Sequence, residues 1–170
     1  MKRNKASDLR TAFDRSFAEP PPGEAEPTQA YLGIRVGGKA YAVALAEIGA
    51  VVADKKIAPL PSKASELLGV AGVRGDTVPV FSLAALLGVR GGEERPRWLL
   101  LATGGRAGFA FDALDGHLDV PLAQVTPLAA PRGFIHANAV LGGGARGIVN
   151  IASLMDHLER RAGSGTPKEQ

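Results

Sequence analysis

The chain has 170 residues, enough for one domain with terminal extensions. Lys and Arg exceed Asp and Glu by three (20 minus 17), and no basic stripe interleaved with aromatic residues crosses the middle of the chain. This pattern argues against a nucleic-acid partner. No cysteine is present, which excludes a disulfide framework and a thiolate metal site. No apolar run approaches the ~18 residues of a membrane span, so we expect no direct membrane insertion and a cytoplasmic location.

The first 29 residues read as a helix followed by a linker. Leu9, Phe13 and Phe17 recur every four residues, which places them on one face of a short amphipathic helix over residues 1–19. The proline-rich stretch 20–29 cannot continue that helix. Two interpretations stay open. The segment is either a frayed tail or a docking helix whose Leu/Phe face needs a groove on a partner or on its own domain.

From Tyr31 the pattern changes to the period of two that is typical of strands. Tyr31–Val36, the turn Gly37-Gly38 and Tyr41–Leu45 predict a hairpin. The apolar run Ile48–Val52 predicts another strand. Ile57–Pro61 contains two prolines, so it cannot be a central strand, where every amide must donate to the ladder.

The middle of the chain predicts one strand between two short helices. Ser62–Leu68 fits one or two helical turns, ended by Gly69. Thr77–Phe81 follows as a strand that contains an edge-type proline. Ser82 is a suitable N-cap for a short helix over Leu83–Leu87.

The second half begins with another hairpin, formed by Trp98–Ala102 and Ala107–Phe111 around a Gly-Gly turn. Val120–Pro127 is expected to be extended and broken by prolines, and Phe134–Leu141 and Ile148–Ile151 are short strand candidates. Asn150 can cap a last helix, which carries on one face the side chains Ile151, Leu154, Met155 and Leu158. Residues 161–170 have the composition of a disordered tail.

Together these elements predict an all-β fold. Two halves, each led by a hairpin and ended by a short helix, suggest two small packed barrels. Neither half is large enough for an independent core, so we expect the barrels to share one.

Residue patterns that would support catalysis are missing. The three histidines, His117, His136 and His157, are dispersed and have no metal-binding spacing. Residues 142–147 formally match the glycine-rich nucleotide motif, but a strand follows where the motif needs a helix. We therefore expect a non-enzymatic protein without metal or cofactor.

Five segments, in order and with their spacing kept, resemble the CheW-like domain, which is shared by the chemotaxis adaptor CheW and the regulatory domain of its histidine kinase CheA. Gly69–Gly75 leading into Val78-Pro79-Val80 is similar to the family signature G-V-x-x-L-R-G-x-x-x-P-V, with Val73 for Leu. The first hairpin, with the alternating run Tyr41–Ile48, resembles the family's opening strand pair. The other matches are Gly108–Asp112, Gln124–Pro127 and Val149–Ile151. The similarity covers roughly residues 31–158.

The resemblance implies a fold and a function. The fold would be a pair of small, SH3-like five-stranded β-barrels over residues 30–160, sharing a core, with short helices that include a C-terminal one. The function would be that of a scaffold or adaptor, with the signalling tip of a chemoreceptor in the groove between the barrels and a CheA-type kinase regulatory domain at the barrel ends. Other CheW-like proteins are further expected partners.

The resemblance also implies which residues bind the receptor. Arg74 matches the family arginine associated with receptor coupling, and its guanidinium offers a rigid fork of donors to carboxylates or carbonyls. An ordinary solvated loop arginine is the alternative. Its neighbours Gly72, Val73 and Gly75 belong to the same loop. The candidate groove-lining residues, each of which could equally be plain core, are Leu45, Ile48, Val51 and Val70.

Departures from the family pattern leave two alternatives to this function. Ala50 stands where the family often has a glutamate that can pair with the arginine, and charged residues of the family are also replaced at Ser82, Ala84, Gly116 and Gly143-Gly144. The chain could therefore be an accessory paralogue that has lost one interface, the kinase interface in particular, and modulates or insulates an array. A small ligand-binding barrel or enzyme is the other alternative.

Overall fold

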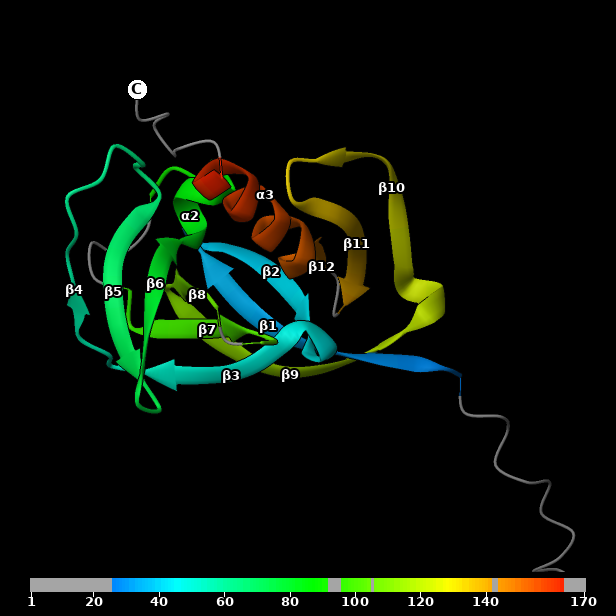
Figure 1. The fold of residues 1–170 in the computed structure, drawn as a ribbon. Helices are drawn as coiled ribbons and strands as arrows, with labels where there is room; N and C mark the ends of the chain where they lie inside the picture. The colour runs from blue at the N-terminus through cyan, green and yellow to red at the C-terminus, as the bar shows by residue number, and fades with distance from the viewer. Residues whose placement is uncertain (1–25, 92–95, 105, 142–143, 164–170) are drawn as a thin grey trace, which may run out of the picture.

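The computed structural model describes residues 26–91, 96–104, 106–141 and 144–163. The predicted N-terminal helix with Leu9, Phe13 and Phe17, most of the linker, and residues 164–170 lie outside these ranges. Within them the chain forms two six-stranded sheets, and Figure 1 shows both curving around the middle of the molecule. The prediction of an all-β fold is confirmed, with six strands in each sheet where five were expected.

The first sheet joins the two ends of the domain. Its strand order is β10-β11-β12-β2-β1-β9. The strands are β1 (Thr28–Val36), β2 (Lys39–Ala44), β9 (Ala113–Pro121), β10 (Val125–Arg132), β11 (Ile135–Leu141) and β12 (Gly144–Val149).

The second sheet is formed by the middle of the chain, with the order β3-β7-β8-β6-β5-β4. Its strands are β3 (Ile48–Ala53), β4 (Ile57–Ala58), β5 (Leu67–Val73), β6 (Asp76–Ser82), β7 (Trp98–Ala102) and β8 (Gly108–Phe111). The proline-flanked strand β4 lies at the edge, as its two prolines predicted.

The division into two halves in chain order is wrong. The hairpin β1-β2 joins the C-terminal strands, because β12 runs parallel to β2 with Ile148 opposite Ala42. The hairpin β7-β8 joins the earlier strands, because β8 runs parallel to β6 with Phe109 opposite Phe81. A hairpin pattern in the sequence sets local antiparallel pairing, but it does not determine which distant strand completes the ladder.

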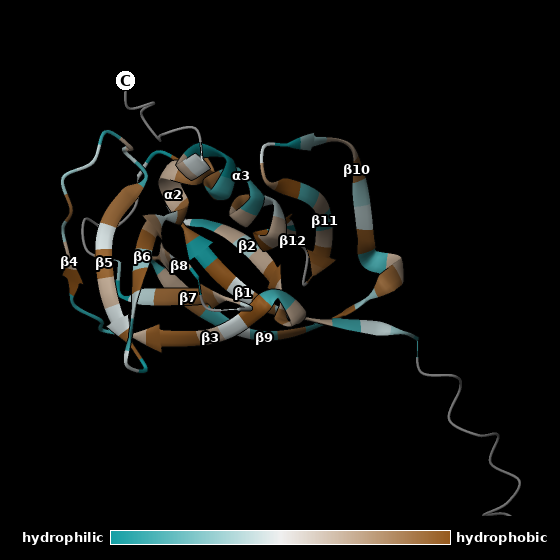
Figure 2. Ribbon diagram, viewed as in Figure 1, coloured by the Kyte–Doolittle hydropathy of each residue, from teal (hydrophilic) through white to brown (hydrophobic). Residues whose placement is uncertain are grey.

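Three clusters of buried side chains hold the sheets together. One lies inside each sheet, and the largest lies between them, where it takes side chains from both sheets and from both α-helices. We call this largest cluster the shared core. It includes Ile34, Val43, Leu83, Phe109 and Leu154. The prediction of a shared core is therefore confirmed, and Figure 2 shows the hydrophobic bands of the strands that supply it.

Both predicted helix caps are present. Ser82 accepts a hydrogen bond from the backbone N–H of Ala85 at 3.2 Å and starts α2 (Leu83–Leu86). Asn150 accepts from the N–H of Ser153 at 2.7 Å and starts α3 (Ile151–Gly163). Two short 3₁₀ turns, η1 (Leu45–Glu47) and η2 (Leu122–Gln124), connect β2 to β3 and β9 to β10. The side chains of Ser82 and Asn150 thus pair backbone amides that the first turn of each α-helix would leave without a partner.

The helix predicted over Ser62–Leu68 is absent. The segment has a bend at Lys63 and a turn at Ser65 and Glu66, and β5 begins at Leu67, opposite Phe81 of β6. The Glu66 carbonyl accepts from the Ser82 N–H at 2.7 Å, so pairing with β6 overrides the local helical pattern. At the other end of the domain, α3 continues through residues 161–163, which the sequence placed in the tail. No helix in the described ranges is long and apolar enough to cross a membrane.

Candidate functional site

The loop between β5 and β6 holds an arginine in an unfavourable backbone conformation. Val73 pairs with Asp76, so Arg74 and Gly75 form a two-residue hairpin loop. Their φ angles are 54° and 91°, and two positive values are typical of a type I′ turn, which favours Asn or Gly at its first position. An arginine there costs about 1–2 kcal/mol. This cost motivates the hypothesis that the side chain of Arg74 serves a purpose other than forming the turn.

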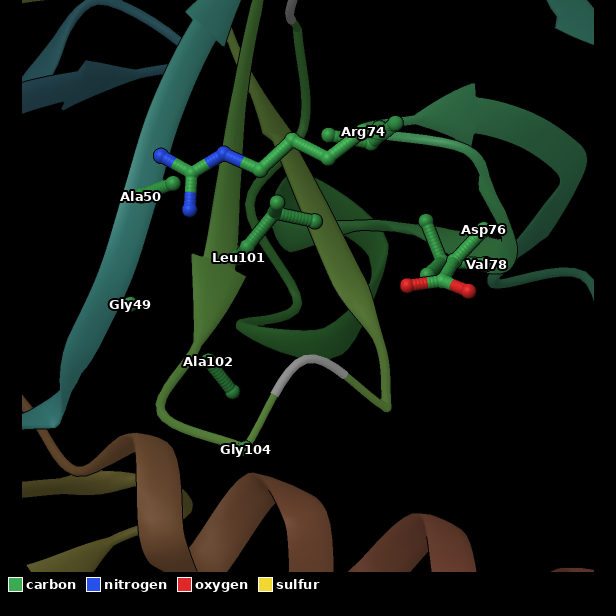
Figure 3. Close-up of a pocket in the computed structure, with 9 residues that line it drawn as sticks. Gly49, Ala50, Arg74, Asp76, Val78, Leu101, Ala102 and Gly104 are labelled. Carbon is green, nitrogen blue, oxygen red and sulfur yellow. The ribbon is translucent and has the colours of Figure 1, made fainter.

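The Arg74 side chain extends over a shallow pocket of 290 Å³. Figure 3 shows its guanidinium beside Ala50 of β3, while the carboxylate of Asp76 lies on the other side of the pocket. Nothing in the described part of the chain forms a hydrogen bond or ion pair with Arg74. The pocket is lined by Gly49, Ala50, Val73, Arg74, Asp76, Val78, Leu101, Ala102 and Gly104. An exposed guanidinium above a mostly apolar pocket is suited to bind an acidic or carbonyl-bearing partner surface.

Gly49 determines the shape of this pocket. The register of β3 with β7 shifts between Ile48 and Ala50, so Gly49 is the extra residue. A Cβ at Gly49 would lie 2.8 Å from the carbonyl oxygen of Ala102, closer than side chains are found. Glycine therefore allows β3 to bend at the point where the pocket opens.

The structure brings only part of the predicted site together. Val73 and Arg74 line the pocket, Gly75 completes the turn, and Gly72 is exposed on β5. The four predicted groove-lining residues are dispersed: Ile48 and Val51 pack against the shared core, Val70 is half-buried on β5, and Leu45 lies in η1. None of these four lines the pocket, and their role in binding stays a prediction.

The sequence did not reveal that Glu47 links the two sheets to α3. Its carboxylate accepts hydrogen bonds from the N–H groups of Ile151 and Ala152, each at 3.3 Å. Glu47 lies in η1, the connection between the sheets, and its backbone carbonyl accepts from Thr103. An acid at a helix N-terminus is stabilised by the helix dipole, so this contact holds the crossover in place. Burial, and secondarily the charge of Glu47, raise the pKa of Tyr31.

A second unanticipated contact ties the other end of α3 to the second sheet. Glu66 is only 7% exposed and pairs with Arg161 near the helix C-terminus. The Ser65 hydroxyl also donates to Glu66, at 3.3 Å. Positively charged side chains are favoured near a helix C-terminus, and a buried carboxylate needs a partner. Glu47 and Glu66 together hold α3 across the junction of the sheets.

A third ionic contact joins strands β9, β1 and β12 of the first sheet. Asp115 accepts from Arg146 at 2.7 Å and from Arg35 at 2.9 Å, and its side chain is 18% exposed. Asp115 has no partner in the ladder, because Gly33 lies opposite Gly116 and the next pair is Ile34 with Leu114. Gly116 has a φ of 111°, which suits glycine, so its lack of a side chain is a requirement of this bulge.

Replacing Asp115 with Asn is expected to remove part of the acid sensitivity of folding. Burial raises the pKa of Asp115, but the hydrogen bonds and charges of Arg146 and Arg35 outweigh burial and hold it below 3.8. A lowered carboxylate pKa stabilises the fold above the unfolded-state pKa, and this contribution is lost as the pH falls through the folded-state value. Urea unfolding at pH 7 and pH 3 measures it. The loss on acidification should be smaller for Asp115→Asn, and an unchanged loss would contradict the assignment.

Across residues 26–163, wherever the structure describes them, no three His, Cys, Asp or Glu side chains are arranged to hold a metal ion. The histidines lie apart, and the ring of His157 packs edge-on against Phe134 at 5.2 Å between centroids.

Comparison with known proteins identifies relatives over most of the chain. The family model of the CheW-like domain matches residues 30–159. Protein PilI of Pseudomonas aeruginosa is 30% identical over 149 residues, covering 76% of this chain and 84% of PilI. Protein FrzA of Myxococcus xanthus is 31% identical over 119 residues, covering 68% of this chain and 72% of FrzA.

The fold also matches a solved structure, the scaffolding protein TtCheW from Thermoanaerobacter tengcongensis. The TM-score is 0.65 at 18% sequence identity, covering 73% of this chain and 90% of TtCheW. At this identity the match supports the fold alone. It confirms the predicted arrangement of two SH3-like barrels with a C-terminal helix.

Proposed function

Since the chain belongs to the CheW-like domain family, we propose that it is a non-enzymatic adaptor, which couples a chemoreceptor signalling tip to the regulatory domain of a CheA-type histidine kinase. The observation that carries this proposal is the setting of Arg74. Its backbone has an unfavourable positive φ above the pocket, and no carboxylate of the described residues forms an ion pair with its guanidinium. A cation placed in this way is suited to an interaction between proteins.

Arg74 would act by hydrogen bonding to the receptor. Its guanidinium can donate to carboxylates or carbonyls at the tip of a helical hairpin, and such charge-assisted bonds are stronger than neutral ones. The pocket beneath the guanidinium, with the half-buried Ala50 among its lining residues, would receive a side chain of the same tip. Gly72 and Gly75 leave the surroundings of the turn open, because a Cβ at either position would meet no atom within 4 Å.

The remaining predicted contacts belong to the same proposal. Leu45 and Val70 are half-buried outside the hydrophobic clusters, so they could contact a partner without loss of core packing. Ile48 and Val51 would contribute mainly by shaping β3 beside the pocket. We further propose that residues 1–19 form a docking helix attached by the linker 20–29, and that the chain works beside receptor clusters in the cytoplasm, where it can also meet other CheW-like proteins.

A second candidate function is that of an accessory paralogue which binds the receptor and has lost the kinase interface. The departures at Ser82 and Ala84 favour it, because they replace charged residues of the family at the end of β6 that lies away from Arg74. Such a protein would occupy receptors without recruiting the kinase, and would therefore modulate or insulate an array.

Arg74→Asp is expected to weaken receptor binding about tenfold or more, because the change replaces donors by a charge of opposite sign at the contact. The melting temperature should not fall by more than about 2 °C, since Arg74 is exposed, makes no bond within the described chain, and occupies a turn position that tolerates Asp better than Arg. Isothermal titration against a purified receptor signalling domain, together with thermal unfolding, measures both quantities.

Arg90→Asp is the matched control. Arg90 is also exposed but follows α2, at the opposite end of β6 from the hairpin loop, so it should bind like the unaltered chain. If Arg74→Asp folds and binds the receptor as tightly as Arg90→Asp, Arg74 does not belong to the interface.

A further inference from the structure

A second pocket, of 440 Å³, lies in the sheet that does not carry Arg74. Its floor is formed by side chains at the margin of the shared core, with Tyr41 on β2 and Ile135 on β11. Gly147 lies between them, where a Cβ would come within 3.3 Å of both side chains. The close approach of these three residues gives the pocket a firm floor.

The strand β10 forms one wall because it bows away from the sheet. Pro127 pairs with Ala137 and Arg132 pairs with Ile135, so the residues from 128 to 131 lie opposite His136 alone. Leu128, in this bowed segment, lines the pocket together with Arg132. Figure 1 shows β10 and β11 standing out to one side of β12 and β2.

Tyr41 brings into the pocket a hydroxyl that has no hydrogen-bond partner among the described residues. The residue is 7% exposed, and its hydroxyl forms no hydrogen bond within the described residues. No buried side-chain N or O atom there lacks a partner, so the hydroxyl must retain some contact with solvent, and the residue lines this pocket. Burial raises the pKa of Tyr41, so near neutral pH the hydroxyl is protonated and can donate.

Two positively charged residues line the same pocket as this hydroxyl. Lys39 at the start of β2 and Arg132 at the end of β10 both line the pocket and are exposed, and neither has an ion-pair partner in the part of the chain that is described. The lining holds no carboxylate, and Asn138 adds a further donor. Donors therefore converge next to an apolar surface made by Leu128 and Ile135.

We propose that this pocket binds an acidic segment of a protein partner. A carboxylate of that segment accepts hydrogen bonds from Lys39, Arg132 and the Tyr41 hydroxyl, and a neighbouring apolar side chain packs on Leu128 and Ile135. The apolar wall favours a peptide over a small inorganic anion, which would leave that surface exposed. The pocket lies in the sheet opposite to Arg74, so the proposal stands whether or not Arg74 binds a receptor.

The test titrates the full chain with a fluorescein-labelled peptide of alternating Glu and Leu, and with the same peptide carrying Gln for every Glu. Fluorescence anisotropy gives the affinities, and backbone amide shifts in nuclear magnetic resonance locate the site. The Glu peptide should bind about tenfold tighter than the Gln peptide, as charge-assisted hydrogen bonds predict. The largest shifts should fall on β2, β10 and β11.

Three variants test separately the two cationic side chains, the Tyr41 hydroxyl and the overall charge of the chain. Lys39→Glu combined with Arg132→Glu should abolish binding of the Glu peptide. Tyr41→Phe keeps the ring but removes the donor, and should weaken binding about fivefold with little change in melting temperature. Lys56→Glu reverses an exposed charge in the other sheet's β3-β4 loop and should have no effect.

Three results would overturn the proposal. Equal binding of the Glu and Gln peptides would remove the role of the carboxylate. If Lys56→Glu weakened binding of the Glu peptide as much as the Lys39 and Arg132 changes do, the effect would come from the overall charge of the chain and not from this pocket. Inorganic phosphate that shifts the same amides and fully displaces the Glu peptide at millimolar concentration would indicate a site for a small anion.

Discussion

Phe109→Ala is expected to lower the free energy of unfolding by about 3–5 kcal/mol, because the change removes a fully buried aromatic ring and leaves a cavity. Phe109 lies on the central strand β8, is 0% exposed, and packs in the shared core with Ile34 and Val149 of the other sheet. Both sheets should therefore unfold together. Urea unfolding followed by the fluorescence of Trp98, the single tryptophan, and by far-ultraviolet circular dichroism measures the change.

Leu60→Ala is the control for this prediction. Leu60 is 46% exposed, so its truncation should change stability by no more than about 0.5 kcal/mol. If tryptophan fluorescence and circular dichroism in Phe109→Ala gave different unfolding midpoints, with the second sheet unfolding before the first, a single shared core would be contradicted.

Gly69→Ala is expected to destabilise the fold by about 3 kcal/mol, through a steric clash combined with backbone strain. A Cβ at Gly69 would lie 2.0 Å from the carbonyl oxygen of Ala58, and the φ of Gly69 is 145°. The position lies at a register shift in β5, next to the edge strand β4. Chemical denaturation of the purified variant gives the change in unfolding free energy.

Gly72→Ala provides the matched comparison within the same strand. A Cβ at Gly72 would meet no atom within 4 Å, and its φ is not positive, so stability should change by less than about 0.5 kcal/mol. Similar effects at Gly69 and Gly72 would show that the close approach of β4 to β5 is not a determinant of stability.

Local pattern was enough to predict both hairpins and both α-helices of this fold, but not the strands β5 and β9 or the 3₁₀ turn η2 within the stretch Val120–Pro127 that was expected to be extended. The Gly37-Gly38 turn between two alternating segments gave the first hairpin, and Ser82 and Asn150 gave both helix starts. These features depend on neighbours within a few residues. The failure at Ser62–Leu68 has the same origin, because the local pattern allowed a helix and only pairing with distant β6 made the segment extended.

Long-range features were not predictable in this way. The exchange of hairpins between sheets rests on two parallel pairings, of β12 with β2 and of β8 with β6, and no local motif encodes them. The polar contacts of Glu47, Glu66 and Asp115 join residues far apart in sequence. The bulge also explains the departure from the family pattern at Gly116, where a positive φ favours glycine over the acid that the family usually has.

The candidate site was predicted in part. The glycine-flanked setting of Arg74 indicated a special loop, and the structure places Arg74 in a two-residue hairpin loop with a positive φ, beside Ala50. The groove-lining residues could not be separated from core residues, because an apolar side chain on a strand fits either role. The pocket at Tyr41 left no trace in the sequence, since its residues come from strands at both ends of the domain.

The most direct test of the adaptor function is a titration of the full-length chain against a receptor signalling domain and a CheA-type kinase regulatory domain, separately and together, with kinase activity measured in the reconstituted mixture. The proposed function predicts binding to both, a ternary complex, and kinase activation that depends on the chain and is lost in Arg74→Asp. Receptor binding without any binding to the kinase domain would contradict coupling and leave the accessory role, and binding to neither would contradict both.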